Sequence, residues 1–335
     1  MINKIYDKTI KFIKEEYKFV ILCLVILVVG VFPLPVNLYT GGGIINLENR
    51  IEIEDENKEK GSFNLAYVRE VRATLPTYLL SFIVDWERES IKSVKIDEND
   101  NASDMWKRQK LYLKEANDNA IINAYRLANE PINIKKEVFQ VLHIDKIAET
   151  NLEIGDEIIS IDGNAIKEYD DIIKVSSTKE VGEKINVQVL RNNEEINCYA
   201  VTKEIENEKK MGIYLIKLYD YEVDRDIDLK FTEREGGSSG GFMLSLAIYN
   251  RLVPEDITKG LKIVGTGTID SNGNVGEIGG VKYKLKGAVS NKADVFFVPV
   301  ANYAEAMTEK NEHNYDIEIV KVNSLQDAVN YLESR

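Results

Sequence analysis

The hydrophobic positions of this chain begin with one uninterrupted apolar run, Phe19 to Val36, which contains no charged residue. At about 1.5 Å per residue, a helix of this length is about long enough to cross a hydrocarbon core of about 30 Å. The pattern therefore predicts a transmembrane helix at residues 19–36. A second apolar patch, Leu79 to Val84, is too short to span a bilayer, and we expect it to pack in a core.

The charges on either side of the apolar run predict its orientation. Several lysines precede the run, and the first basic residue after it is Arg50. Because cytoplasmic flanks carry the excess of Lys and Arg, residues 1–18 are predicted to be a cytoplasmic tail and the rest to face outward. The competing interpretation is a cleaved signal peptide, but the run ends in Phe32 to Val36 without the small residues that a signal peptidase needs. We therefore expect a retained, single-pass anchor in the cell membrane.

The periodicity after the anchor changes from helical to alternating. Gly41 to Gly43 suggests a flexible exit, Gly61 to Val71 is typical of a strand, and Trp106 to Leu127 has apolar residues at helical spacing. Pro131 interrupts this pattern, and a β-rich segment runs from about Val138 to Glu204. The mixture predicts an α+β fold.

Two turns organise the β-rich segment. Ile154 to Ile166 combines a Gly-Asp turn, a strand and a tight Asp162-Gly163 turn, and Val181 to Val201 is typical of a hairpin that turns at Asn192-Asn193. This segment resembles the bacterial PDZ domain, although the family's glycine-rich carboxylate loop has no counterpart around Glu137 to Leu142. The resemblance implies docking of an extended peptide at a sheet edge, and the alternative is a rigid spacer.

Charge and composition exclude several functions. A net charge of -13 without a separate basic cluster argues against nucleic-acid binding. Cys23 and Cys198 cannot build a disulfide framework, and together with two distant histidines, His143 and His313, they predict no metal site. The chain contains no phosphate-binding Gly-x-x-x-x-Gly-Lys-Ser/Thr string, so we expect neither ATP nor another cofactor.

The strongest candidate chemistry lies in a glycine loop, Gly236 to Gly240, which precedes an apolar helix that continues to Leu252. A helix start presents N–H groups and the positive end of the helix dipole, which together suit an oxyanion. Ser238 in this loop could attack a carbonyl carbon. Such loops also bind phosphate or simply form turns.

A nucleophilic serine needs a base, and this chain is poor in histidine. His143 falls in the PDZ-like segment, and His313 is predicted to lie in a polar loop. Lysine can replace histidine where burial lowers its pKa. One candidate is Lys282, which follows a predicted strand at Val264 to Ile269 and the Gly279-Gly280 pair; the alternative is that Lys282, Lys284 and Lys286 form one solvated face.

The two stretches together resemble the proteolytic domain of the Lon (S16-type) serine proteases. That family carries Gly-Pro-Ser-Ala-Gly around its nucleophile and Pro-Ile-Gly-Gly-Leu-Lys around its lysine. Here the matching residues are Gly236, Gly237, Ser238, Ser239 and Gly240, and then Glu277, Ile278, Gly279, Gly280, Val281 and Lys282. The resemblance implies Ser238 as nucleophile, Lys282 as general base and Thr266 as the partner that orients the lysine, with Gly237 and Gly240 supporting the loop. Glycine in place of proline at position 237 is expected to loosen the loop, and Ser239 in place of alanine supplies a second hydroxyl.

The order of anchor, PDZ-like segment and Lon-like segment resembles the membrane-bound pheromone-processing peptidases of Gram-positive bacteria. The predicted domains are a tail (1–18), a transmembrane helix (19–36), a first protease part (37–130), a PDZ-like domain (131–206) and a Lon-like proteolytic domain (207–335). The resemblance implies an ATP-independent endopeptidase that cleaves peptides or exposed protein segments outside the cytoplasm. It also implies that the chain can form homo-oligomers. The alternative is an inactive membrane-anchored scaffold that binds peptides through its PDZ-like groove.

Overall fold

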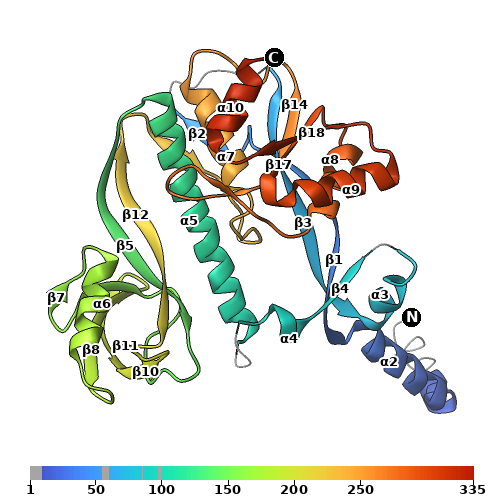
Figure 1. Cartoon of the computed structure of the whole chain (residues 1–335). Coiled ribbons are helices and arrows are strands. Elements are labelled where there is room, and N and C mark those ends of the chain that lie inside the picture. Colours follow the sequence, from blue (N-terminus) through green and yellow to red (C-terminus); the bar gives the residue numbers. More distant parts are fainter. Residues whose placement is uncertain (1–9, 55–59, 85, 97–99) are drawn as a thin grey trace, which may run out of the picture. The chain divides into compact units, whose positions relative to one another are not determined.

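The computed structural model describes residues 10–54, 60–84, 86–96 and 100–335 (Figure 1). It combines helices with mixed sheets, so the α+β prediction is confirmed. The chain divides into two compact units: unit 1 comprises residues 1–41 and 68–96, and unit 2 comprises residues 42–67 and 97–335. Strands β1 (Pro33–Asn46) and β3 (Ser62–Thr74) contribute residues to both.

Unit 1 begins with the apolar helix α2 (Tyr17–Val31), none of whose side chains is buried. The predicted helix end at Val36 is wrong, because β1 starts at Pro33, whose ring removes the N–H donor that another helical turn would need. Gly41 to Gly43 also lies within β1 and is not a loop. Among the described residues, no helix combines the length and apolar character that a membrane crossing requires. Residues 1–9 of the predicted tail lie outside the described part of the chain.

The rest of unit 1 is small. It contains α3 (Leu75–Leu80), β4 (Glu87–Ser90) and α4 (Ile91–Val94), and β4 pairs antiparallel with residues 36–39 of β1. The prediction that Leu79 to Val84 packs in a core is wrong, since Leu79, Phe82 and Ile83 are exposed. Unit 1 provides no layer of its own that could cover them, because none of the residues of α2 or α3 is buried.

Unit 2 contains most of a six-stranded sheet, with strand order β18-β17-β14-β3-β1-β4 when its continuation into unit 1 is included. Three neighbouring pairs are parallel: β3 with β14, β14 with β17, and β17 with β18. The strands not yet bounded are β14 (Lys262–Gly265), β17 (Val295–Pro299) and β18 (Glu318–Val322). The helices of this region are α7 (Gly241–Leu252), α8 (Val281–Ser290), α9 (Tyr303–His313) and α10 (Leu325–Glu333), with a 3₁₀ turn η1 (Val300–Asn302) before α9.

The main hydrophobic core draws on sequence before and after the PDZ-like segment. Phe63 and Ala120 precede that segment, while Phe242 and Phe297 follow it, and all four belong to the same buried cluster. Helix α5 (Ala102–Ala128) packs against α7 within this core. The PDZ-like segment is therefore an insertion between two parts of one core.

Small two-stranded sheets complete this region. Strands β2 (Ile51–Ile53) and β13 (Ile227–Leu229) pair with each other, as do β15 (Thr268–Ile269) and β16 (Val275–Gly276). The predicted strand at Val264 to Ile269 is thus divided between β14 and β15. Gly273 has φ +82° at the turn of the second hairpin, which explains the Asn272-Gly273 signal.

The inserted segment forms a second sheet of order β12-β5-β6-β8-β9, with its own buried cluster. Its elements are β5 (Ile132–Ile144), β6 (Glu157–Ile161), β7 (Asn164–Ala165), α6 (Tyr169–Thr178), β8 (Lys184–Arg191), β9 (Glu194–Val201), β10 (Lys203–Ile205), β11 (Glu208–Lys210) and β12 (Ile213–Val223). Asn192 and Asn193 both have positive φ at the β8–β9 turn, as the hairpin prediction requires. Figure 1 shows β5 and β12 as one long antiparallel ribbon that runs beside α5.

Candidate active site

Ser238 lies in the loop that enters α7, and this loop is closely packed. Gly237 has φ +90°, and its N–H donates to the Gln109 carbonyl of α5 at 2.9 Å. A proline, whose φ is held near −65°, could not adopt this backbone. A Cβ atom on Gly240 would lie 2.8 Å from Leu65 Cδ2, so the Leu65 side chain would have to shift to accommodate a larger residue there. The expectation that Gly237 loosens the loop is therefore wrong, because its left-handed conformation allows the contact with α5.

The loop delivers Ser238 to the N-terminal end of a buried helix. All residues of α7 are buried, and Gly240 is the N-cap residue without any side-chain cap. The first N–H groups of a helix have no partner within it, and they carry the positive end of the helix dipole. The N–H groups of Gly241 and Phe242 already donate to the carbonyls of Ser238 and Gly267, each at 3.1 Å. The half-buried Ser238 therefore lies at the positive end of the helix dipole, and donors for an oxyanion would have to come from the other N–H groups of the loop and first turn.

The lysines after Gly280 differ sharply in environment. Helix α8 begins at Val281, so residues two positions apart point in different directions. Lys282 is half-buried, with Nζ 4.7 Å from the centre of the Tyr283 ring. Lys284 is only 3% exposed, and burial lowers the pKa of its amine from 10.5 to about 8. Lys286 is exposed. The alternative of a single solvated lysine face is therefore wrong.

Thr266 connects Lys284 to the serine loop. Lys284 Nζ donates to Thr266 Oγ1 at 3.1 Å, and Thr266 Oγ1 donates to the Ser239 carbonyl at 3.0 Å. The N–H of Gly267 donates to the same carbonyl at 2.9 Å. Thr266 is fully buried, so this chain of hydrogen bonds is shielded from water. The predicted lysine-orienting residue thus contacts Lys284 two residues beyond the predicted base.

A cleft of about 440 Å³ opens over Ser238. Its walls come from α5, from Lys217 and Tyr219 of β12, and from the β15–β16 hairpin. Asn119 of α5 is 6% exposed and lines this cleft. Its Nδ2 donates to the Ile269 carbonyl at 3.1 Å, while its Oδ1 is buried and has no hydrogen-bond partner among the described residues. A buried acceptor without a partner is costly unless a ligand supplies a donor.

Acidic groups lie on the α5 side of the cleft. Burial raises the pKa of Asp118 to about 6, although the Tyr219 N–H donates to this carboxylate at 3.0 Å. The pKa of Glu115 is also raised, first by burial and then by the charge of Asp118, while Lys217 opposes the shift. The cleft therefore has polar walls, and both carboxyl groups on this side of α5 have raised pKa values.

In the PDZ-like segment, both edges of β5 are already paired. On one side Val141 N–H donates to the Asp156 carbonyl at 2.9 Å, next to β6. On the other side β12 runs antiparallel to β5 from the Ile213–Ile144 pair onward. Ile213 and Leu215 pack against the buried cluster of this segment. The glycine-rich loop that this sequence lacks would lie in the region where β5 pairs with β12. Because β5 lies between β12 and β6, it has no free edge for an added peptide strand.

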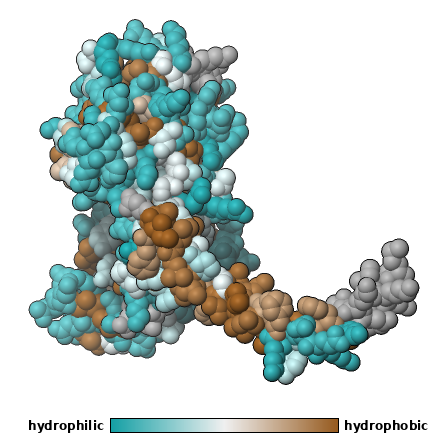
Figure 2. Space-filling model, turned by 90° about the vertical axis from the view of Figure 1, so that its right-hand side faces the viewer, coloured by the Kyte–Doolittle hydropathy of each residue, from teal (hydrophilic) through white to brown (hydrophobic). Residues whose placement is uncertain are grey.

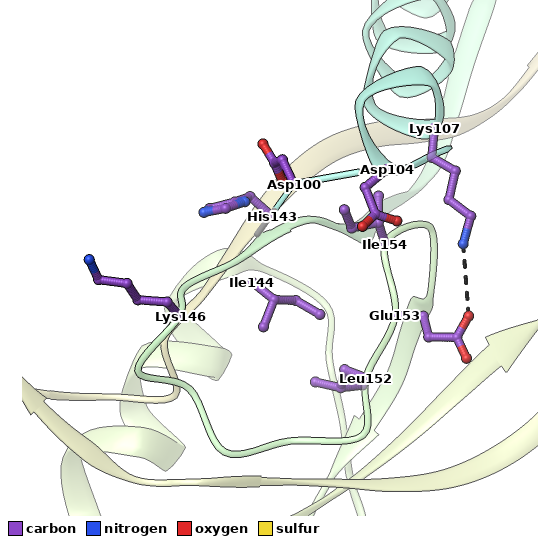
Figure 3. Close-up of a pocket in the computed structure, with 9 residues that line it drawn as sticks. All are labelled: Asp100, Asp104, Lys107, His143, Ile144, Lys146, Leu152, Glu153 and Ile154. Carbon is purple, nitrogen blue, oxygen red and sulfur yellow. Dashed lines mark ion pairs between the residues drawn. The ribbon is translucent and has the colours of Figure 1, made fainter. Parts of the chain in front are cut away.

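A second hollow of about 380 Å³ lies where the end of β5 approaches the start of α5 (Figure 3). Lys107 of α5 and Glu153 of the β5–β6 loop form an ion pair of 3.8 Å across it. Asp100, Asp104 and His143 add polar side chains. Neither Ser238 nor Lys284 lines this hollow.

The two histidines do not join the serine loop through any contact in the described residues. His143 is buried in β5 beside Tyr214, and His313 is the last residue of α9, not part of a loop. Ligand atoms of Glu309, Glu312 and His313 lie within 4.8 Å of one another. Two of these three residues are exposed, and His313 Nδ1 lies 3.2 Å from a Glu309 carboxylate oxygen, an ordinary i,i+4 pair.

Sequence reasoning therefore missed Lys284 and Asn119. The helical register after Gly280 could have identified Lys284, because it shares a face with the buried residues Val281, Leu285 and Ala288. No sequence signal identified Asn119, since its importance depends on an acceptor that only the packing of α5 leaves without a partner.

Comparison with known proteins identifies the inserted segment. The PDZ domain family matches residues 126–200. The chain is similar to the PDZ domain of the SdrC-like protein from Listeria monocytogenes, with 21% identity, covering 25% of this chain and 93% of that one, at a TM-score of 0.23. It is also similar to a protein from Geobacillus thermodenitrificans, with 25% identity, covering 24% and 95% of the two chains, at a TM-score of 0.22.

The PDZ prediction is thus confirmed, and PDZ domains are modules for peptide binding or protein interaction. No curated protein matches the chain. The matched residues do not include Ser238, Thr266 or Lys284, so the Lon resemblance stays a prediction.

Proposed function

We propose that this protein is an ATP-independent serine endopeptidase of the Lon type, in which Ser238 is the nucleophile and Lys284 is the general base. The observation that carries the proposal is the buried Lys284 amine with its pKa near 8, hydrogen-bonded to Thr266 and through it to the serine loop. A buried lysine without a carboxylate partner is expensive to maintain, and such groups are typical of catalytic sites.

The proposed reaction uses each group in turn. Neutral Lys284 accepts the Ser238 proton while Oγ attacks the peptide carbonyl carbon, and N–H groups at the start of α7 stabilise the oxyanion. The resulting ammonium gives its proton to the leaving amine as the C–N bond breaks. Water then hydrolyses the acyl-enzyme, with Lys284 again accepting a proton. Thr266 holds the amine in position and does not react.

This assignment moves the base from Lys282 to Lys284 and keeps the other proposed residues. Lys282 is half-buried with its amine over the Tyr283 ring, whereas the Lys284 amine is buried and donates to Thr266 Oγ1. Ser238, Thr266, Gly237 and Gly240 retain the roles that the resemblance implies. The substrate is a peptide or an exposed protein segment that enters the cleft as an extended strand.

We further propose that the apolar segment 19–36 attaches the protein to the cell membrane, with the catalytic cleft on the extracytoplasmic side. The support is the absence of charge from Phe19 to Val36 and the absence of any buried residue in α2. An apolar helix in water would leave this surface uncompensated.

Cleavage of an unfolded, fluorescently labelled casein by the purified full chain tests the peptidase proposal. Ser238→Ala is expected to reduce the rate by at least about 10³-fold, because it removes the proposed nucleophile. Ser239→Ala is the matched control, with the same small change one residue away. Loss of activity in Ser239→Ala alone would move the nucleophile, and full activity in both variants would refute the proposal.

The second candidate is an inactive PDZ scaffold at the membrane, which the PDZ match favours. It predicts no cleavage by the wild-type chain and unchanged partner binding in Ser238→Ala. The pairing of both β5 edges opposes it, because strand addition needs a free edge.

A further inference from the structure

We infer that α3 and the turn after it form a membrane-contacting shoulder that inserts into the headgroup region of a lipid bilayer. The shoulder is defined as residues 75–84. Leu79, Phe82 and Ile83 are 57%, 63% and 84% exposed, and Leu80 is 42% exposed. A cluster of large apolar side chains left in water is typical of an interaction surface.

The shoulder is held in a defined conformation. Thr74 and Thr77 form a capping box at the start of α3. Ser81 Oγ donates to the Tyr78 carbonyl at 2.6 Å, and Arg88 donates to the Ser81 carbonyl at 2.5 Å. These bonds satisfy the polar groups of the turn locally. The apolar side chains are therefore presented outward by a built element.

The neighbouring helix argues that the occupant is lipid. Helices α2 and α3 contact each other within unit 1, and none of the α2 residues is buried. At about 1.5 Å per residue the 15 residues of α2 extend about 22 Å, shorter than a hydrocarbon core of about 30 Å. Figure 2 shows hydrophobic residues, in brown, gathered into a continuous surface on this face of the molecule. If α2 lies in the hydrocarbon core, the apolar residues of the shoulder would lie near the membrane surface, at the depth in the bilayer where α2 ends.

The side chains of the shoulder also fit a membrane interface. The Tyr78 and Phe82 rings lie edge to face with centres 5.3 Å apart, and the Arg88 guanidinium carbon lies 4.3 Å from the centre of the Phe82 ring. Aromatic and basic side chains are enriched at the boundary between headgroups and hydrocarbon. Insertion would remove several large apolar side chains from water. Full burial of one such side chain lowers the free energy by about 1.5–3 kcal/mol.

Site-specific fluorescence on the full chain tests this inference. Cys23→Ser removes the exposed cysteine and leaves the buried Cys198. An NBD label at Ile83→Cys, in chains reconstituted into phosphatidylcholine–phosphatidylglycerol vesicles, is expected to show blue-shifted emission. Lipids with a nitroxide near the headgroup should quench it, because interfacial segments lie at the boundary between headgroups and acyl chains.

Labels elsewhere keep the test decisive. Leu79→Cys repeats the measurement if Ile83→Cys fails to fold, and Val300→Cys, which is exposed in unit 2, should show neither effect. Emission at 83 and 79 typical of water, without quenching, would refute the shoulder. A blue shift without lipid quenching would also refute it, because it would indicate burial against a second copy of the chain. None of these outcomes depends on peptidase activity.

Discussion

The inserted PDZ domain and the serine cleft illustrate two different relations between pattern and function. Residues 126–200 match a known family, yet both edges of β5 are already paired within the chain. The serine cleft lies outside that match, yet one of its walls carries an acceptor without a partner among the described residues, and the loop that carries Ser238 is linked through Thr266 to a buried lysine with a lowered pKa. Recognition of a fold therefore does not establish its usual binding site, whereas burial and unsatisfied chemistry can indicate a site without a family match.

The difference also concerns the role of β12. Its first half completes the PDZ sheet with Ile213 and Leu215, and its second half lines the serine cleft with Lys217 and Tyr219. One strand thus belongs to both regions. The PDZ domain, a module for peptide binding or protein interaction, therefore shares a strand with a wall of the cleft.

Among the tests of the serine cleft against the PDZ domain, substitution of the two lysines is expected to have the largest effect on the rate of cleavage. Lys284→Met should reduce casein cleavage by about 10²- to 10⁴-fold, the usual contribution of a general base. Lys282→Met is the matched control and should retain near wild-type activity. The opposite result would return the base to Lys282.

The pH dependence checks the same assignment. Burial depresses the pKa of Lys284 to about 8, so the amine is mostly protonated below pH 8 and neutral above it. The wild-type rate should therefore rise as pH increases through about 8 and then level off. A rate that is flat from pH 7 to pH 9 would contradict Lys284 as the base.

A moderate effect is expected from Asn119. We expect its Oδ1 to accept a substrate main-chain N–H, so Asn119→Ala should lower kcat/KM about three- to tenfold, the value of one neutral hydrogen bond. Asn117→Ala is the control, because Asn117 Oδ1 is also buried without a partner among the described residues but does not line the cleft. Equal losses of kcat/KM in both variants, measured with the same peptide, would mean that Asn119 stabilises the fold and does not bind substrate.

The smallest effect is expected in the PDZ domain. Leu215→Ala should lower the free energy of unfolding by about 1–3 kcal/mol, below the usual cost of a fully buried leucine because Leu215 is half-buried. Tyr214→Ala, at an exposed position of the same strand, should change it by less than about 0.5 kcal/mol. Urea unfolding followed by circular dichroism measures both. Equal, small changes would mean that β12 does not stabilise this sheet.

Local patterns in the sequence were sufficient for several elements. The apolar spacing predicted helix α5, and the Asn192-Asn193 and Asn272-Gly273 pairs predicted two hairpins. These signals succeed because turn conformations and amphipathic faces depend on neighbouring residues. The same is true of the glycine loop before α7, whose small residues predicted a sharp turn at Ser238.

Contacts between distant segments decided the rest. The sequence could not show that Leu79 to Val84 stays exposed, because apolar residues are equally compatible with a core and with an external surface. The helical spacing after Gly280 favours Lys284 as the buried lysine, but its hydrogen bond to Thr266 depends on how α8 packs in the fold.

By itself the sequence determined the alternation of helices and strands, the PDZ domain, and the candidate serine on its glycine loop. Only the tertiary structure decided which lysine is dehydrated and that β12 fills the edge of β5. The physical reason is that desolvation and strand pairing depend on what packs around a residue. Those neighbours are tens to hundreds of positions away in the chain, as Thr266 is from Ser239 and β12 is from β5.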